Sequence, residues 1–437
     1  MMKKIFNTTV SLPVFLTIFL LEMPAIKNPE INNPAIKNPA IKNQDIVSPE
    51  CQITKWNLPV ALKTDSTKNS PVLVQRLPVG CCENDASCLD ERIYGGVQDK
   101  TADKKALLKS MDQSLKYLRT ARAAAAYQRY KIAGITRDRV YGSLQRFRQL
   151  VLTTNSPQEL QAAIEKEFVY YQSIGRDSQG TVLFTAYYEP LYLASRKPTK
   201  EFKYPVYRLP PNLGSWPRPH PTRLELEGAD GLQGAKGKLK GLELFWFRDR
   251  FEPYIIQIQG SAKLKLTDGT QTSIGYAGNT AHNYKSLGRT LIEAGKLPEN
   301  GVTMPTIFEY FQKNPQDLNI YLPRNNSFVF FRETNGRPAH GSVGVPLTPE
   351  RSIATDKSLM PPGALALIRA PFPFANNKGE LEHRIVSRYV LDQDTGGAIK
   401  GAGRVDYYLG TGDIAGDRAG VTVSNGQLFY LLLKTEK

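Results

Sequence analysis

The sequence has 437 residues and a hydrophobic fraction of 41%, which gives room for two or three domains and excludes a polytopic membrane protein. Its formal net charge of +16 favours polyanionic partners such as nucleic acid, anionic lipid or an acidic cell-wall polymer. Because no helix-turn-helix, zinc-finger or RNA-binding signature accompanies this charge, we expect no nucleic-acid partner.

The first residues have the pattern of an export signal. Lys3 and Lys4 precede an apolar run over residues 10–21, which is too short to span a bilayer comfortably. We therefore expect an exported protein with a signal peptide over residues 1–25, although no clean Ala-x-Ala cleavage site follows the run. No cysteine stands just behind it, so we expect no lipoprotein anchor.

Residues 26–97 are expected to form a linker. Their first part, residues 26–43, repeats a short unit rich in Pro and Asn, a composition that cannot bury a core and predicts disorder. The linker also holds all the cysteines of the chain, whose even number favours one or two disulfides in an oxidising compartment. A zinc site is less favoured, because their spacing lacks C-x2-C and no His is near. The cysteines are Cys51, Cys81, Cys82 and Cys88.

From residue 98 to 190 the pattern predicts helices followed by a strand. An apolar stripe at helical spacing begins after Ala102, and Ser156 before Pro157 has the signature of a helix start. The stripe consists of Leu107, Met111, Leu115 and Leu118. The other expected elements are helices over residues 136–152 and 156–171 and a strand over residues 182–188, which ends at Glu189-Pro190.

Residues 191–326 change to short strands, turns and basic residues, and residues 327–437 return to strands. This order fits one β domain inserted into another. The expected strands cover residues 243–247, 254–259, 263–266, 271–276, 328–332, 365–368, 384–391 and 428–433. The expected helices cover residues 283–293 and 306–314.

An Asp- and Gly-rich stretch follows the strand that ends at Leu391. Five aspartates fall within residues 390–420, and glycines between them allow tight turns and close approach of a ligand. Carboxylates held in such turns suit acid–base chemistry. An active site and a structural loop remain equally open at this point. An EF-hand is excluded, because the ligand spacing and the closing Glu are missing.

Other classes of enzyme lack their motifs here. The sequence contains no G-x-G-x-x-G in a strand-turn-helix context, no G-x-x-x-x-G-K-[ST] and no H-E-x-x-H. Its histidines are widely separated, so we do not expect a zinc hydrolase, and we expect neither a metal nor another cofactor. The histidines are His220, His282, His340 and His383.

Four stretches in order carry a family resemblance. They are FTAYYEP (184–190), YPVYRLP (204–210), IQIQGSAKLKLTDG (256–269) with GYAGN and YKSLGRTLIEAG behind it, and residues 327–408, which include ATDKS, DTGGAIKG and RVDYY. Together they resemble the MltA family of lytic murein transglycosylases, whose C-terminal part is the 3D domain named for three aspartates. The likeness spans about residues 102–434. One departure is Gly260-Ser261-Ala262, where the family usually has Gly-Ser-Gly.

The resemblance implies a mainly β fold with N-terminal helices. Residues 98–190 and 327–437 would build a double-psi β-barrel domain, residues 191–326 would form an inserted second β-barrel domain, and a glycan groove would lie between them. The implied partners are peptidoglycan glycan strands, with other cell-wall enzymes as further candidates. A monomer in the periplasm or at the outer membrane is implied as well.

The family's three aspartates fall on Asp356, Asp394 and Asp406, and the family's catalytic acid corresponds to Asp406. For Asp356 and Asp394 we favour a turn-holding role over catalysis, since Asp readily bonds to its local backbone. About half of the sugar-binding candidates are expected to be packing residues instead. These candidates are Tyr187, Tyr188, Glu189, Gln257, Gln259, Gly260, Ser261, Tyr276, Asn279 and Lys400.

The implied reaction cleaves the β-1,4 bond between N-acetylmuramic acid and N-acetylglucosamine without water. One carboxyl group protonates the leaving oxygen and then accepts the proton of the muramyl C6 hydroxyl, which closes a 1,6-anhydro ring. Apolar and aromatic neighbours would keep such an acid protonated. Two alternatives stay open: a hydrolytic muramidase, which needs a second carboxylate such as Glu189, and a non-catalytic peptidoglycan-binding module.

Overall fold

The computed structural model describes residues 72–76, 89–95, 102–130 and 132–435, which belong to the unit Ala61–Lys437. The expected signal peptide, the repeat and the four cysteines lie outside these residues. Among the helices that are described, none combines the length and the apolar character needed to cross a bilayer.

The largest sheet closes on itself into a six-stranded barrel. Its strands are β3 (Val182–Glu189), β10 (Ser352–Ala354), β11 (Leu365–Ala375), β12 (Leu381–Asp394), β13 (Arg404–Thr411) and β14 (Val423–Leu433). They pair in the order β14-β11-β12-β10-β13-β3, and β3 pairs again with β14. The pairs β3–β13 and β10–β12 are parallel, whereas the others are antiparallel. Two further strands extend the sheet from β14, namely β2 (Phe168–Ser173) and β1 (Leu73–Gln75).

A second ring of strands is inserted between β3 and β10. A four-stranded sheet has the order β4-β7-β8-β9, and β5 pairs with β6. Isolated bridges join Ser195 to Trp246 and Arg208 to Phe331, so they connect the β5–β6 pair to both edges of the four-stranded sheet. The strands are β4 (Leu191–Ala194), β5 (Tyr204–Tyr207), β6 (Glu243–Phe247), β7 (Ser261–Leu266), β8 (Gln271–Asn279) and β9 (Val329–Glu333).

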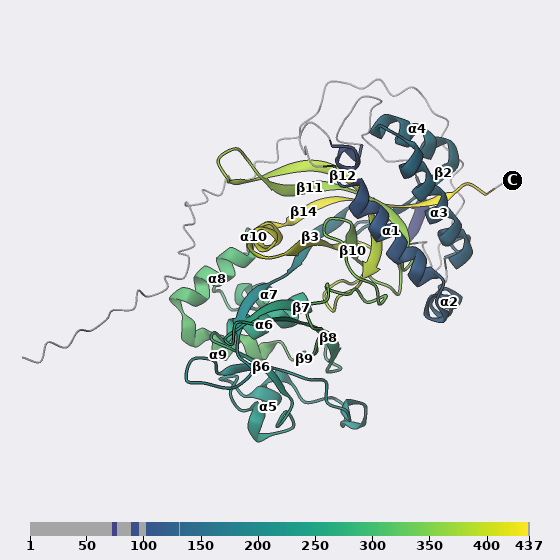
Figure 1. Ribbon diagram of the computed structural model, residues 1–437. Coiled ribbons are helices and arrows are strands. Elements are labelled where there is room, and N and C mark those ends of the chain that lie inside the picture. The colour runs from purple at the N-terminus through teal and green to yellow at the C-terminus, as the bar shows by residue number, and fades with distance from the viewer. Residues whose placement is uncertain (1–71, 77–88, 96–101, 131, 436–437) are drawn as a thin grey trace, which may run out of the picture. The chain divides into compact units, whose positions relative to one another are not determined.

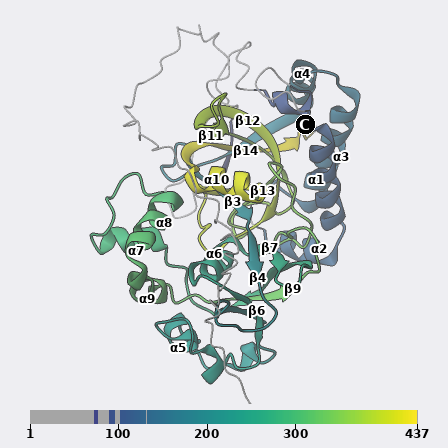
Figure 2. The ribbon, with the colours of Figure 1, turned by 60° about the vertical axis from the view of Figure 1, so that its left-hand side comes forward.

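Helices pack against both rings. Figures 1 and 2 show α1 and α3 side by side against the large barrel, whereas α5 to α9 belong to the inserted part of the chain. The helices before β3 are α1 (Lys104–Leu118), α2 (Ala121–Gln128), α3 (Arg137–Thr153) and α4 (Pro157–Glu167). The later ones are α5 (Arg223–Glu227), α6 (Phe251–Gln259), α7 (Leu287–Glu293), α8 (Met304–Lys313), α9 (Leu318–Tyr321) and α10 (Asp413–Val421). Short 3-10 turns are η2 (Glu91–Ile93), η3 (Leu213–Ser215), η4 (Gly234–Lys236), η5 (Pro315–Asp317) and η6 (Leu322–Arg324).

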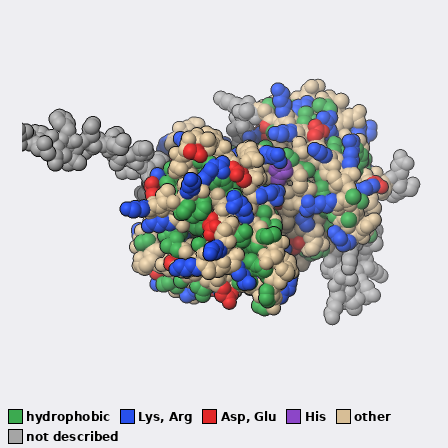
Figure 3. Space-filling view, turned by 60° about the horizontal axis from the view of Figure 1, so that its bottom comes forward, with side chains coloured by type: hydrophobic (Ala, Val, Ile, Leu, Met, Phe, Trp, Pro, Cys, Tyr) green, Lys and Arg blue, Asp and Glu red, His purple; other side chains and the backbone are tan. Residues whose placement is uncertain are grey.

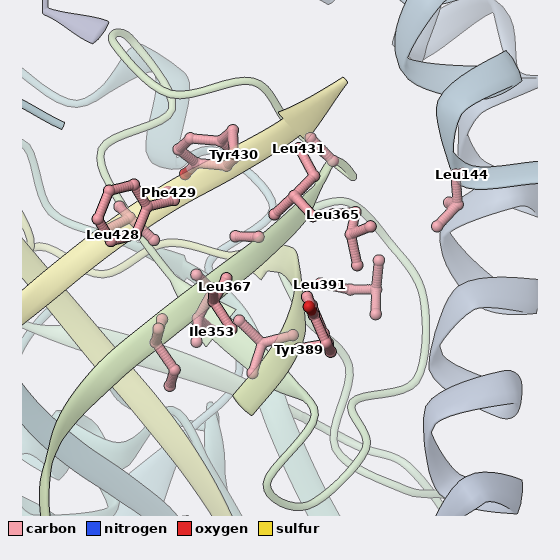
Figure 4. Close-up of a cluster of buried hydrophobic side chains, with 14 of the residues drawn as sticks. Leu144, Ile353, Leu365, Leu367, Tyr389, Leu391, Leu428, Phe429, Tyr430 and Leu431 are labelled. Atoms are coloured by element: carbon pink, nitrogen blue, oxygen red, sulfur yellow. The ribbon is translucent and has the colours of Figure 1, made fainter. Parts of the chain in front are cut away.

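The main core fills the large barrel and the space beneath α1 and α3. Figure 4 shows side chains of β11, β12 and β14 meeting around Ile353, with Leu144 of α3 pointing toward them. The predicted stripe of α1 is buried as expected. These observations confirm a mainly β fold with N-terminal helices, in which a second β-barrel is inserted into a double-psi β-barrel.

Two expectations about local structure were wrong. Residues 254–259 form part of α6 and not a strand, although Ile and Gln alternate over residues 256–259 with the period of a strand. Gly260 ends α6 with a φ of +82°, as a helix C-terminus commonly requires. The helix expected over 156–171 ends at Glu167, where β2 begins. Residues 413–421, for which no element was predicted, form α10.

Candidate active site

Asp406 projects from the outer face of the large barrel. Val405 and Tyr407 on either side of it are buried in the barrel core, and successive side chains of a strand point to opposite faces. Its strand β13 lies beside β3 (Figure 2). The register pairs Arg404 with Leu183, Asp406 with Thr185 and Tyr408 with Tyr187. The outer faces of both strands therefore form one row of polar and aromatic side chains around Asp406.

The carboxyl group of Asp406 is sparingly hydrogen-bonded. The Thr185 hydroxyl donates to its Oδ1 over 2.7 Å, and Oδ2 accepts no hydrogen bond from the described residues. Burial raises the pKa of Asp406 to about 6, and the negative charge of Asp394 acts in the same direction. The Thr185 hydrogen bond and the Arg404 charge oppose this shift only in part. Roughly one tenth of the group is therefore protonated at pH 7, far more than for an ordinary aspartate.

Asp394 lies two strands away from Asp406. Ala354 of β10 pairs with Asp394 on one side and with Asp406 on the other, so the two Cα atoms are about 10 Å apart at normal strand spacing. Both oxygens of Asp394 are occupied. Oδ2 accepts from the Tyr187 hydroxyl over 2.8 Å, and Oδ1 accepts from the backbone N–H groups of Ser342 (2.7 Å) and Thr395 (2.8 Å). Burial raises the pKa of Asp394, whereas these donors lower it.

Asp356 fastens the loop before β13. Its Oδ1 accepts from the backbone and the hydroxyl of Ser358, and its Oδ2 accepts from the Gly401 N–H over 2.9 Å. Although burial acts in the opposite direction, these hydrogen bonds and the charge of Lys400 lower the pKa of Asp356. These contacts tie the chain after β10 to the chain before β13.

The candidates on β3 have different surroundings. Tyr187 packs its ring against Tyr408 at 5.2 Å between centroids, on the same face as Asp406. Tyr188 points to the opposite face and packs against the barrel core and Gly416 of α10. Glu189 is only 2% exposed, accepts from the Thr411 hydroxyl over 2.9 Å, and has its pKa raised by burial.

The candidates around the end of α6 serve mainly as internal contacts. Gln257 is buried, and its Oε1 accepts from Arg223 (2.7 Å) and from the Val329 N–H (3.1 Å). Gln259 accepts from the Tyr188 N–H over 3.0 Å and so links α6 to β3. Gly260 supplies the carbonyl oxygen for the Tyr276 N–H, and Ser261 begins β7 opposite Gly275.

Three candidates are exposed. Tyr276 is 48% exposed on β8, and its hydroxyl contacts the Oδ1 of Asn279. Lys400 stands in the loop between β12 and β13 and forms no hydrogen bond or ion pair with the described residues. These three side chains are therefore available to a ligand, in contrast to Gln257 and Tyr188.

The histidines do not form a metal-binding cluster. The structure brings two of them together, since His282 Nε2 meets the His220 carbonyl oxygen at 2.5 Å and His220 Nδ1 accepts from the Ala281 N–H. Within the described parts of the chain, no three His, Cys, Asp or Glu side chains are arranged to hold a metal ion.

Comparison with known proteins identifies the family. Residues 183–332 match the family model of the MltA specific insert domain, and residues 351–432 match that of the 3D domain. The membrane-bound lytic murein transglycosylase A of Escherichia coli K12 is 33% identical over 264 residues, which cover 60% of this chain and 68% of that protein. The Vibrio cholerae protein of the same name is 35% identical over 262 residues, with 60% and 68% covered. The chain belongs to the MltA family of lytic murein transglycosylases.

Solved structures of MltA proteins have the same fold. A membrane-bound lytic murein transglycosylase from Agrobacterium tumefaciens aligns with a TM-score of 0.62 and 27% identity, covering 79% of this chain and 95% of that one. E. coli MltA with bound chitohexaose aligns with a TM-score of 0.60 and 26% identity, covering 84% and 95%. In this MltA-family chain, Thr185 and Tyr187 lie in the first matched region, whereas Asp394 and Asp406 lie in the second.

Two residues next to the aspartates of this MltA-family site were not predicted from the sequence. Thr185 donates a hydrogen bond to Asp406. It precedes the candidate Tyr187 by two residues on the predicted strand, so both side chains were expected on one face, and this spacing could have identified Thr185. Lys357 contacts the buried carboxylate of Asp392 and the backbone oxygen of Asp394. Lys357 follows Asp356 in the ATDKS motif, but the motif does not show its contact with Asp394, which lies 37 residues further along the chain.

Proposed function

We propose that this chain cleaves the β-1,4 bond between N-acetylmuramic acid and N-acetylglucosamine in peptidoglycan and leaves 1,6-anhydromuramyl ends. Asp406 acts as general acid and then as general base. It donates its proton to the glycosidic oxygen as the C1–O bond breaks, and its carboxylate then takes the proton of the muramyl C6 hydroxyl as that oxygen bonds to C1. Every atom of the substrate is retained in the two products, so no water is consumed.

The observation that carries this proposal is the environment of Asp406. A pKa of about 6 keeps the group able both to donate and to accept a proton near neutral pH. One oxygen is held by Thr185, while Oδ2 has no donor among the described residues. This arrangement suits a single carboxyl group that performs both transfers.

A hydrolytic muramidase is less well supported by the surrounding carboxylates. Glu189 lies four residues beyond Thr185 on β3, about 13 Å along the strand from the position of Asp406, and it is 2% exposed. Asp394 lies nearer, but three hydrogen bonds occupy its oxygens. Neither is placed to activate a water molecule on the far side of the sugar, as an inverting enzyme requires.

The bound glycan is proposed to use the exposed candidates, namely the Tyr276 ring, the Asn279 amide and Lys400. An aromatic face and amide groups suit a sugar, which has both apolar and hydroxyl-bearing surfaces. Asp356 and Asp394 are proposed to hold the loops of the site. We also propose an envelope location, in agreement with the membrane-bound names of the relatives.

The test is digestion of purified sacculi in H2-18O, followed by mass spectrometry of the soluble products. We expect 1,6-anhydromuramyl ends without incorporated 18O from the wild type and almost no release from Asp406→Asn. Asp413→Asn, which changes an exposed aspartate of the same Asp- and Gly-rich stretch, should behave as the wild type. Reducing ends that carry 18O would establish the muramidase instead, and binding without any cleavage would establish the binding module.

A further inference from the structure

A hollow of about 350 Å³ lies beside the row that holds Asp406. It is lined by the turn at Gly175 and Arg176, by Leu183, and by the loop that leads into β13. Its charged lining residues are Arg176, Lys400 and Arg404, and its lining contains no Asp or Glu. The hollow is therefore cationic. Lys and Arg are spread more widely over the molecule, as the face in Figure 3 shows, but here three converge on one cavity.

The strand register fixes the distance between this hollow and the acid. Arg404 pairs with Leu183, and Asp406 pairs with Thr185 two residues further along the same two strands. Arg404 and Asp406 therefore point to the same face, with Cα atoms about 7 Å apart. A sugar whose scissile bond meets Asp406 would bring its ring substituents to the mouth of the hollow.

The cations of the hollow retain unused donors. The Nε of Arg404 is buried without a hydrogen-bond partner among the described residues, and its Nη2 meets the Thr185 hydroxyl at 3.4 Å. Arg176 uses one nitrogen on Asn425, and a Cβ placed at Gly403 would meet the Arg176 Cγ at 2.2 Å. Gly403 thus lets the Arg176 stem lie flat against the loop. Lys400 has no partner among the described residues.

Neighbouring acids do not neutralise these cations by direct contact. Asp177, next to Arg176, accepts hydrogen bonds from the N–H groups of Gln179 and Thr181 in its own turn. Asp356 accepts from Ser358 and Gly401, although its charge is felt by Lys400. A neutral glycan backbone offers no counterpart to three clustered cations, whereas a carboxylate does.

We infer that the hollow binds carboxylates carried by the muramyl side chain of the substrate. N-acetylmuramic acid differs from N-acetylglucosamine by a lactyl ether on O3, which ends in a carboxylate or continues into an acidic stem peptide. The inference rests on the proposed function, because it places the muramyl ring at Asp406. It makes the site selective for muramyl residues over the neutral sugar of the same strand.

The test compares the wild type with Arg176→Gln/Lys400→Gln on peptide-bearing glycan strands and on the same strands with their carboxylates amidated. Amidation should raise the wild-type KM about threefold to tenfold, as expected for the loss of two part-exposed ion pairs. The double variant should have the raised KM on both substrates. Lys240→Gln, which removes an exposed cation outside the hollow, should keep the wild-type KM.

A third substrate, strands freed of peptide by an amidase, distinguishes the two sources of carboxylate. Amidase cleavage frees the lactyl carboxylate, which is amide-bonded on peptide-bearing strands. A difference in KM between wild type and double variant on the freed strands assigns the hollow to the lactyl carboxylate, and a difference confined to peptide-bearing strands assigns it to the stem peptide. Equal KM values for both proteins on peptide-bearing strands and on amidase-treated strands alike would overturn the inference. Calorimetric binding of soluble muramyl peptides to Asp406→Asn, with and without the double substitution, tests the hollow even if the product proves to be hydrolytic.

Discussion

Replacement of Asp406 by Asn should stabilise the protein at neutral pH. Burial raises the pKa of Asp406 from 3.8 to about 6. Ionisation of this group therefore costs more free energy in the folded state than in the unfolded state, by about 1.36 kcal/mol per pKa unit. The protonated group is favoured in the folded state, and this preference is present below about pH 4 and lost as the pH rises through 6. At pH 7.5 the wild type should therefore be about 3 kcal/mol less stable than Asp406→Asn.

Urea denaturation of both proteins at pH 4, 5, 6 and 7.5 measures this difference. The advantage of Asp406→Asn should be near zero at pH 4 and should grow to its full value by about pH 7. Asn retains an oxygen that can accept the Thr185 hydrogen bond, so the change is confined to the charge. Asp413→Asn should stay within about 0.5 kcal/mol of the wild type at every pH. A pH-independent difference for Asp406→Asn would refute the raised pKa.

Three further predictions concern the supports of the site and its charge. Lys357→Met leaves the buried Asp392 carboxylate without its cation, so urea denaturation should show a loss of about 3–5 kcal/mol in the free energy of unfolding. A loss under about 1 kcal/mol would contradict this expectation. Gly416→Ala places a Cβ 2.8 Å from the Tyr188 ring, so thermal unfolding should show a loss of about 1–3 kcal/mol in the free energy of unfolding. An unchanged Tm would show that the Tyr188 ring moves aside without a free-energy cost. Co-sedimentation with sacculi should weaken as salt rises to about 0.5 M. Salt-independent binding would show that the net charge does not contribute to sacculus binding.

Local periodicity made much of the fold predictable. The α1 stripe and the strand predicted over residues 182–188 are set by residues close in sequence, and each pattern matches one element. The helix α6 could not be predicted in the same way. The alternation of Ile and Gln over residues 256–259 has the period of a strand, and the three Ile side chains of α6 favour a strand as well.

Long-range pairing accounts for what the sequence could not predict at the site. Thr185 and Asp406 are separated by 221 residues, and only the parallel pairing of β3 with β13 makes them neighbours. The strand between Asp394 and Asp406 is β10, which has only three residues and no detectable pattern. The separation of the two aspartates depends on that short strand, so it could be obtained only from the tertiary structure.

The three aspartates of the family pattern differ mainly in the donors that surround them. Asp356 accepts from Ser358 and Gly401, and its pKa is lowered in spite of burial. Burial raises the pKa of Asp394, but three donors occupy its oxygens and oppose this shift. Asp406 has one described donor, the Thr185 hydroxyl, so burial prevails and its pKa reaches about 6. A carboxyl group can move a proton near neutral pH only if few donors stabilise its charged form, and among the three this condition is best met by Asp406.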